Sequence, residues 1–215
     1  MAEHPDVLII GGGVIGLTAA YFLAREQVSV EIVDQGDFGK EASWAGAGII
    51  PPGDPSHARD PFDQLRAHSS VLFPRLSADL REQTGIDNGY RRSGGLVFHD
   101  DPRSSSQTPV WEQDPHREWR SEGVRSEEVQ GAAMRRLEPA LGPDLAAAYF
   151  LPELAQVRNP RHLQALLSYC QTRGVRLRPG CPVLGFESQE NRITAARTSA
   201  GSLRAERRSC PALRR

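Results

Sequence analysis

The sequence has little of several features that would place it in a specialised class. Cysteine is scarce: Cys170, Cys181 and Cys210 are an odd number without metal-ligand spacing, which indicates reduced packing or surface residues. Neither sign of charge is in excess, since 26 Lys and Arg stand against 27 Asp and Glu, so nothing indicates nucleic acid as a partner. Hydrophobic residues still make up 39% of the 215 residues, enough for a globular core.

Long hydrophobic runs are also missing. The longest apolar stretch, residues 7–20, is interrupted by three consecutive glycines and is shorter than the roughly 20 residues of a membrane-spanning helix. Glu3 and Asp6 precede it, whereas a secretory signal peptide begins with basic residues. We therefore expect a cytoplasmic protein without a membrane span.

The N-terminal end carries a strand–helix–strand pattern. Residues 7–10 form a short continuous apolar run, as in a buried parallel strand, and residues 14–24 indicate a helix rich in Ala and Leu. Residues 28–33 alternate in hydrophobicity, which predicts a second strand that ends at Asp34.

A glycine-rich turn joins the first strand to the helix. The pattern Gly11-x-Gly13-x-x-Gly16 is followed by Asp34, 18 residues after its last glycine, as in dinucleotide-binding units. Gly11 permits a tight turn, Gly13 lets the backbone approach a pyrophosphate, and Gly16 lets helix and strand pack closely. The helix N-terminus attracts the phosphates, and Asp34 can accept hydrogen bonds from the ribose hydroxyls. The pattern alone does not distinguish FAD from NAD.

The segment after Asp34 favours FAD. Residues 39–50 are small and glycine-rich, which lets the backbone lie flat against an extended cofactor. Ser43 can reach the pyrophosphate, and residues 47–49 can run beside the flavin ring. A surface loop without a ligand is the alternative for this segment.

Gln27 departs from the usual pattern, because glycine is common where the helix ends before the second strand. If the backbone has a positive φ at this position, Gln costs about 1 kcal/mol relative to Gly.

Further elements are expected downstream. The pattern predicts helices at about 61–83 and 126–137, the second capped by Ser126. It predicts a strand over residues 91–99. A later helix is expected to begin with Asn159 as its cap and to end at Gly174.

These residues resemble a known family. Residues 6–34, then Glu41-Ala42-Ser43 and Ala45-Gly46-Ala47-Gly48-Ile49, resemble the FAD-dependent D-amino acid oxidase superfamily. Four later stretches resemble its glycine oxidase branch, which is associated with thiamine biosynthesis: Phe73-Pro74-x-Leu76, Thr84-Gly85-Ile86-Asp87, Tyr90-Arg91-Arg92-Ser93-Gly94-Gly95-Leu96 and Leu137-Glu138-Pro139-Ala140-Leu141. The resemblance covers about residues 6–98 and 126–206.

The resemblance implies an α/β fold in two parts. A Rossmann-like FAD-binding domain with a parallel sheet is interleaved with part of a smaller α+β substrate domain. We expect the FAD-binding domain, incomplete, at residues 1–88 and 154–215, and the partial substrate domain at residues 89–153.

The resemblance also implies a set of residues that bind FAD. Those expected at the ADP half are Gly11, Gly13, Val14, Ile15, Gly16 and Asp34. Those expected near the pyrophosphate and flavin are Ala42, Ser43, Ala47, Gly48 and Ile49. Val183 falls on the strand whose backbone meets the adenine in relatives, although core packing explains its side chain equally well.

No catalytic residue or metal ligand is assigned. In the family, the arginine that binds the substrate carboxylate and a nearby tyrosine lie beyond the position of Arg215. The six histidines are scattered, mostly on polar stretches, and we expect each to be exposed to solvent: His4, His57, His68, His99, His116 and His162.

The activity that the resemblance implies is oxidative deamination. The substrate would be glycine or a similar small amine or amino acid, and O₂ would be reduced to H₂O₂. No nucleic-acid partner is expected, and a homo-oligomer is left open. The alternatives are another oxidase or dehydrogenase of the superfamily, of sarcosine or D-amino acid type, or a catalytically incompetent N-terminal fragment.

The C-terminal end is basic and unpatterned. Residues 193–204 predict a hairpin that turns at Ala200-Gly201, but no buried strand follows it. We expect a truncated or frame-shifted chain that alone binds FAD weakly or not at all, with a frayed basic tail as the alternative.

Overall fold

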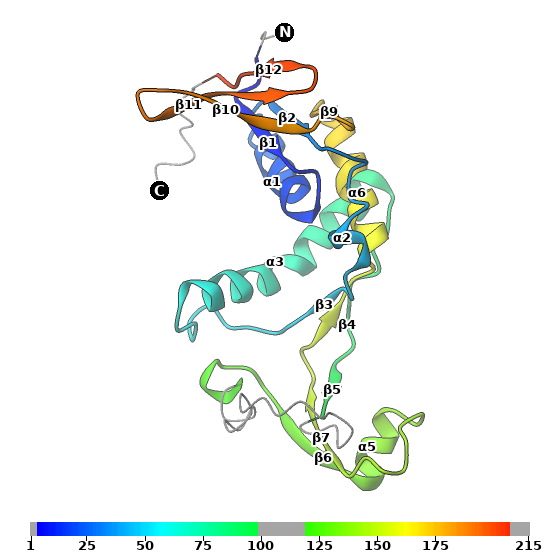
Figure 1. Ribbon diagram of the computed structural model, residues 1–215. Helices are drawn as coiled ribbons and strands as arrows, with labels where there is room; N and C mark the ends of the chain where they lie inside the picture. Colours follow the sequence, from blue (N-terminus) through cyan, green and yellow to red (C-terminus); the bar gives the residue numbers. More distant parts are fainter. Residues whose placement is uncertain (1–3, 99–118, 207–215) are drawn as a thin grey trace. The chain divides into compact units, whose positions relative to one another are not determined.

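The computed structural model describes residues 4–98 and 119–206, and the chain divides into two compact units. Each unit combines separated stretches of chain, which can be followed by colour in Figure 1. The first unit draws on Met1–Ala47, Ala78–Asn88 and Arg158–Arg215, and the second on Gly48–Ser77 and Gly89–Val157. The predicted FAD-binding and substrate domains concern function, so their assignment stays a prediction. By packing, residues 48–77 group with the second unit.

The described chain contains both helices and strands. The helices are α1 (Val14–Arg25), α2 (Ala42–Ala45), α3 (Pro61–Thr84), α5 (Gly131–Leu137) and α6 (Asn159–Thr172). The strands are β1 (Val7–Ile10), β2 (Val30–Val33), β3 (Ile49–Ile50), β4 (Arg91–Arg92), β5 (Gly95–Val97), β6 (Glu127–Gln130), β7 (Ala147–Leu151), β8 (Ala155–Gln156), β9 (Arg176–Arg178), β10 (Val183–Gln189), β11 (Arg192–Thr198) and β12 (Gly201–Leu203).

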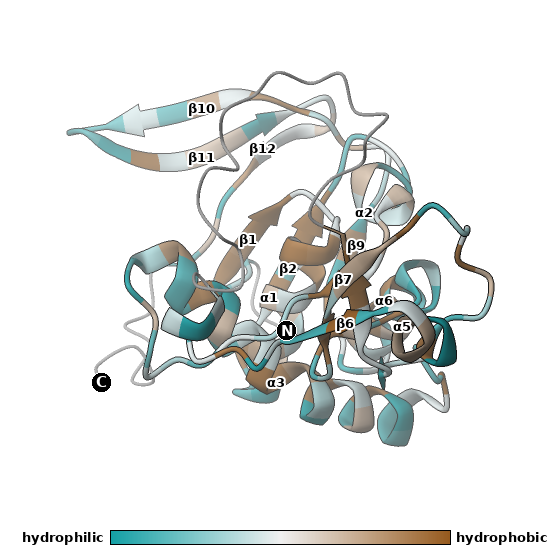
Figure 2. Ribbon diagram, turned by 90° about the horizontal axis from the view of Figure 1, so that it is seen from below, coloured by the Kyte–Doolittle hydropathy of each residue, from teal (hydrophilic) through white to brown (hydrophobic). Residues whose placement is uncertain are grey.

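A parallel sheet in the order β1-β2-β9 forms the centre of the first unit. The middle strand, β2, is buried along its whole length, as expected of a strand covered on both faces. Helix α1 connects β1 to β2 and buries Leu17, Ala20 and Tyr21. Figure 2 shows the hydrophobic colouring along β1 and β2. The predicted α/β fold with a parallel sheet is confirmed.

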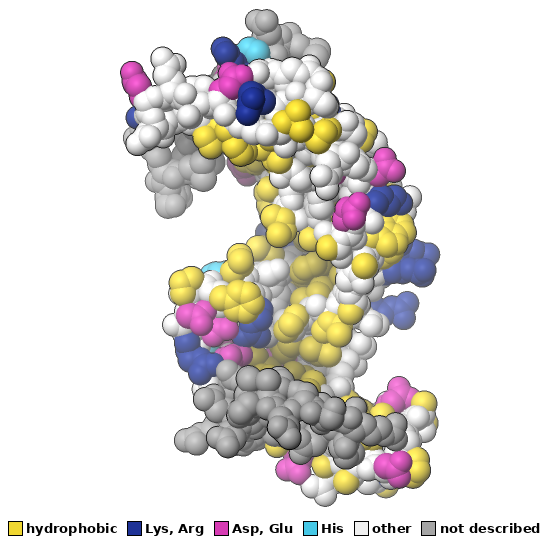
Figure 3. Space-filling view, viewed as in Figure 1, with side chains coloured by type: hydrophobic (Ala, Val, Ile, Leu, Met, Phe, Trp, Pro, Cys, Tyr) yellow, Lys and Arg dark blue, Asp and Glu magenta, His cyan; other side chains and the backbone are white. Residues whose placement is uncertain are grey.

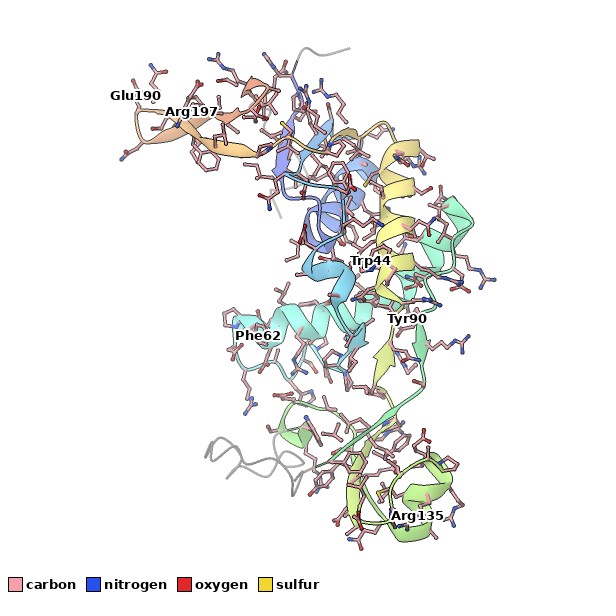
Figure 4. All side chains as sticks on the ribbon, turned by 45° about the vertical axis from the view of Figure 1, so that its right-hand side comes forward. Trp44, Phe62, Tyr90, Arg135, Glu190 and Arg197 are labelled. Atoms are coloured by element: carbon pink, nitrogen blue, oxygen red, sulfur yellow. The ribbon has the colours of Figure 1, made fainter. Side chains whose placement is uncertain are left out.

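A second sheet of the first unit is antiparallel, with β10, β11 and β12 in sequence order. The turn between β10 and β11 passes through Glu190 and Asn191, both with a positive φ, and Figure 4 shows Glu190 at its tip. The turn into β12 places Gly201 at φ 110°, a conformation that favours glycine. The predicted hairpin turn at Ala200-Gly201 is therefore confirmed.

The second unit contains two small antiparallel sheets, β3-β8-β4 and β5-β7-β6. Ile50, Ala155 and Val157 form a buried cluster in the first of them, and Phe73 and Tyr90 pack against it. Figure 3 shows hydrophobic side chains at the surface where α3 begins.

A buried carboxylate connects the start of α3 to a distant segment of the second unit. Glu122 is almost fully buried and lies 2.9 Å from Arg59 Nη2 and 2.6 Å from Arg66 Nη2. Two guanidinium groups thus compensate the desolvation of one carboxylate.

Three predicted elements were wrong in part. The second strand begins at Val30 rather than at residue 28. Residues 91–99 form two short strands, β4 and β5, on different sheets, and His99 lies outside the described residues. Ser126 caps no helix, because β6 follows it and pairs with β7 before α5 begins. Pairing with a distant strand outweighs the local helix signal here.

At the end of α1, Gln27 has the positive φ at which Gln is expected to be less favourable than Gly. Its φ is 59°, so a non-glycine residue occupies the left-handed region. Its N–H donates to Ala24 O, and the next N–H, of Val28, donates to Leu23 O, as at a glycine-terminated helix end.

Membrane-spanning helices and metal-binding groups are both absent from the described residues. No helix within residues 4–98 and 119–206 is long and apolar enough to cross a bilayer. Within the same ranges, no group of His, Cys, Asp and Glu side chains is arranged to hold a metal ion.

Candidate functional site

The candidate site begins at the turn between β1 and α1. Gly11 has a φ of 103°, which favours glycine strongly over other residues. A Cβ on Gly16 would lie 1.9 Å from Gly11 O, so the turn and the first turn of α1 approach too closely for a side chain. The backbone geometry therefore requires glycine at both positions.

Asp34, directly after β2, is fixed beside this turn. Its Oδ2 accepts a hydrogen bond of 2.6 Å from the Gly12 N–H, and its Oδ1 accepts one of 2.8 Å from the Gly36 N–H. Each carboxylate oxygen keeps a second lone pair. The carboxylate is held in place and can still accept bonds from a ligand hydroxyl.

Ser43, in α2, reaches the N-terminus of α1 from 29 residues away. Its Oγ accepts a hydrogen bond of 3.0 Å from the Val14 N–H. A Cβ on Gly13 would lie 3.1 Å from the same Oγ, so glycine at position 13 makes room for the serine. The hydroxyl takes one of the N–H groups that a helix leaves unpaired at its start.

Other N–H groups at this end of α1 remain open. Among the described residues, the N–H groups of Gly13 and Ile15 have no hydrogen-bond acceptor. The Ile15 side chain is exposed, so these groups lie near the surface. Unpaired N–H groups and the helix dipole together make a site that favours phosphate.

Gly12 and Phe38 are parts of the turn that the glycine pattern did not single out. A Cβ on Gly12 would lie 1.9 Å from Phe38 Cδ1, because the phenyl ring lies against this residue. The Gly39 N–H also donates to Gly12 O over 2.9 Å. The available signal for this contact was the second of the three consecutive glycines, Gly12, because the motif itself requires only the first and the third.

The structure brings together only some of the predicted site residues. Those that meet at the start of α1 are Gly11, Gly13, Val14, Ile15, Gly16, Asp34 and Ser43. Ala42 and Ala47 belong to the same unit and are exposed. Gly48 and Ile49 belong to the second unit, where Gly48 O accepts the Val157 N–H and Ile49 pairs with Gln156. Val183 begins β10 and pairs with Thr198.

One histidine prediction was wrong. His162 is 2% exposed, and its Nδ1 lies 3.0 Å from Asn88 Nδ2, in a contact between α6 and the segment after α3. Burial lowers the pKa of His162 to about 4, so it is neutral at pH 7. Its position on the inward face of α6 overrides the polarity of its sequence neighbours. His99 and His116 lie outside the described residues.

The predicted cap of α6 was also wrong. Arg158 occupies the cap position, and its carbonyl accepts the His162 N–H over 2.9 Å. Asn159 is the first residue of the helix. Its side-chain amide packs against Gly46, where an added Cβ would lie 2.5 Å from Asn159 Nδ2.

The two described cysteines carry no site. Cys170 and Cys181 are both buried and unpaired by disulfides. Burial raises the pKa of the Cys170 thiol to about 12, which suppresses its reactive thiolate form. Cys210 lies outside the described residues.

Comparison with known proteins agrees with this geometry. The family model for FAD dependent oxidoreductases, abbreviated DAO, matches residues 6–209. Glycine oxidase of Pseudomonas putida is 32% identical over 202 residues, which are 94% of this chain and 53% of that protein. The bifunctional protein ThiO/ThiG of a Nostoc species is 30% identical over 210 residues, or 94% of this chain and 30% of that protein.

Solved structures give the same similarity. Glycine oxidase of Bacillus cereus superposes with a TM-score of 0.79 at 30% identity, over 94% of this chain and 53% of the other. L-amino acid deaminase of Proteus vulgaris, at a TM-score of 0.71 and 21% identity, shows the fold alone. The chain spans about half the length of the glycine oxidases that it matches.

Proposed function

Because this chain belongs to the family of FAD-dependent oxidoreductases, whose cofactor is FAD, we propose that its first unit holds the ADP half of FAD at the start of α1. The observation that supports this most is the joint placement of three groups. Asp34 is hydrogen-bonded to the glycine turn, Ser43 to the N-terminus of α1, and two neighbouring N–H groups are left without acceptors.

Each group has a distinct task in this proposal. The Asp34 carboxylate accepts hydrogen bonds from the ribose hydroxyls, and its charge disfavours a 2′-phosphate. The N–H groups of Gly13 and Ile15 bind the pyrophosphate, with Val14 and Gly16 completing the turn. Ser43 keeps α2 beside the phosphates. Its Oγ accepts a hydrogen bond from the Val14 N–H, and its O–H hydrogen can be donated to a phosphate oxygen.

The remaining predicted contacts belong to the same proposal. The small residues Ala42, Ala47 and Gly48 let the backbone lie along the pyrophosphate and the flavin, with Ile49 beside the ring. The backbone of Val183, at the start of β10, meets the adenine. The φ of 72° at Gly48 supports a close approach of the backbone, because glycine alone adopts it without strain.

For the whole protein, we propose oxidative deamination of glycine or a similar small amine or amino acid, with O₂ reduced to H₂O₂. FAD supplies the two-electron acceptor for this reaction. The support is the 30–32% identity to proteins named glycine oxidase over 94% of this chain. In this scheme the described residues bind and orient the cofactor, and none is assigned to the amine.

The cofactor proposal is tested by titrating FAD into the 215-residue chain, up to concentrations that detect the weak binding expected of this chain alone, and following flavin fluorescence. Asp34→Ala removes charge-assisted hydrogen bonds to the ribose, and a loss of about tenfold to hundredfold in affinity is expected. Asp37→Ala is the matched control, since Asp37 is an exposed carboxylate three residues away. Equal affinities for FAD in the two variants would contradict the assignment of Asp34.

The substrate proposal is tested separately, on protein that has been shown to carry FAD. Glycine, sarcosine and D-alanine are added without oxygen, and bleaching of the flavin absorption is followed. Bleaching by glycine, with peroxide formed on admitting air, is the expected result. Reduction of a quinone without peroxide would identify a dehydrogenase instead. FAD-loaded protein that none of these amines bleaches would exclude this substrate class.

A further inference from the structure

A hollow lies between α6 and the loop that leads into α2, on residues that the FAD proposal does not use. Its volume is about 520 Å³, within the range of about 300–1,000 Å³ that small-molecule sites have. Phe38 and Trp44 line it from the loop and α2, and Leu163 and Leu167 line it from α6. All its lining residues belong to the first unit.

The two sides of α2 have different neighbours. The Ser43 hydroxyl bonds to the Val14 N–H at the start of α1. Trp44, the next residue of α2, lines the hollow together with residues of α6. Figure 4 labels Trp44 beside α6. The hollow is therefore lined from the Trp44 side of α2, and it adjoins the glycine turn through Phe38, whose ring lies against Gly12.

The charges around the hollow have one sign. Lys40, Arg158 and Arg161 line it, and no Asp or Glu does. Both arginine side chains are exposed and form no ion pair with any described residue. The Lys40 Nζ lies 3.9 Å from the centre of the Trp44 ring, so a cation stacks on the indole that borders the hollow.

From these observations we propose that the hollow binds a small amphipathic anion, with an aromatic or branched apolar body and a carboxylate, sulfonate or phosphate group. The apolar body packs against Trp44, Leu163 and Leu167. The anionic group pairs with Arg158 and Arg161, whose planar guanidinium groups suit bidentate binding of such oxyanions. An apolar pocket with a few convergent charges is the usual form of a small-molecule site.

The test uses two probes of similar apolar surface and different charge. Naphthalene-2-sulfonate and the neutral 2-naphthalenemethanol are titrated into the 215-residue chain by calorimetry. The sulfonate is expected to bind at one site and at least tenfold more tightly than the alcohol. Equal binding of the two probes, or sulfonate binding at several sites without saturation, would overturn the proposal.

Variants locate the site. The double variant Arg158→Gln/Arg161→Gln is expected to weaken sulfonate binding at least tenfold, as is Trp44→Ala. The double variant Arg91→Gln/Arg92→Gln removes two exposed arginines of the second unit and is expected to bind as the parent chain does. Matching unfolding temperatures show that the variants fold. An acidic peptide, acetyl-hexaglutamate, that binds more tightly than the sulfonate and is released by the first double variant would contradict a small-molecule site.

Discussion

At the residue scale, positions with a positive φ show where sequence and backbone agree and where they conflict. Gly11 and Gly201 stand in conformations that favour glycine, and both were expected at turns. Gln27 stands in one as well, at φ 59°, with a side chain that the conformation disfavours. The end of α1 therefore holds strain that a single substitution removes.

Gln27→Gly is predicted to stabilise the chain by about 1 kcal/mol, because glycine adopts this φ without a Cβ clash. Glu26→Gly is the control, since Glu26 has a φ of −84° and gains nothing from glycine. Urea unfolding followed by circular dichroism measures both. A Gln27→Gly variant no more stable than the parent would show that the turn is not strained.

Some residues of the site were predictable and others were not. Gly11, Gly13, Gly16 and Asp34 follow from a local pattern of strand, turn and helix, which carries its own physical reason. The contact of Phe38 with Gly12 and the burial of His162 depend on how distant segments pack. No periodicity within either segment encodes such contacts.

At the element scale, a buried ion pair joins two strands of the parallel sheet. Glu31, in the middle of β2, is 2% exposed and faces β9. Its Oε2 lies 3.2 Å from Arg176 Nε, and its Oε1 pairs with Arg178 Nε. A carboxylate in this position is tolerated only because both arginines compensate its charge.

Glu31→Gln is predicted to destabilise the chain by about 1–2 kcal/mol, because a neutral amide replaces the buried carboxylate and two partly exposed guanidinium groups lose their counter-ion. Glu187→Gln provides the comparison. That carboxylate is half-exposed, lies 3.9 Å from Arg204, and accepts a hydrogen bond from the Ser202 hydroxyl that an amide oxygen can also accept. Its loss is expected to change the stability by less than about 1 kcal/mol. Denaturant unfolding of the two variants compares their losses in the free energy of unfolding. Similar losses in both would mean that Glu31 is not held as a buried ion.

Elements were predicted best where the signal is local. The apolar run of β1, the Ala-rich α1 and the turn at Gly201 all formed as expected. The sequence predicts the start of a helix where β6 forms, since the partner strand β7 lies about 20 residues further along the chain and the sequence of β6 alone does not reveal it. The sequence predicts one strand where β4 and β5 form, because the hydrophobicity of a strand does not determine which sheet it joins.

At the scale of the whole molecule, the chain builds two units from interleaved segments, and α3 contributes to both. Residues 61–77 of this helix pack with the second unit and residues 78–84 with the first. Hydrophobic periodicity predicted the helix and not its division, because an apolar face does not specify its partner. In the first unit, the buried pair of Asn88 and His162 joins the segment after α3 to α6.

This pair makes the stability of the chain depend on pH. The pKa of His162 falls from 6.5 to about 4 on burial, so below pH 6.5 the unfolded chain takes up a proton that the folded chain does not. Stability is predicted to fall between pH 6.5 and pH 4, by about 3 kcal/mol in total, and no further from this group below pH 4.

Urea unfolding at intervals between pH 7 and pH 4 measures this dependence. His162→Gln, which cannot titrate, is expected to lose it, and His68→Gln, at an exposed position, is expected to keep it. A His162→Gln variant that shows the full dependence would assign it to other groups.

The central claim is that the start of α1 receives the phosphates of the ADP half of FAD. Amide hydrogen exchange, measured residue by residue by NMR with and without saturating ADP, tests it most directly. The account predicts slower exchange at Gly13 and Ile15, no change in β11 and β12, and loss of the effect in Asp34→Ala. Unchanged exchange at Gly13 and Ile15 in the presence of bound ADP would contradict it.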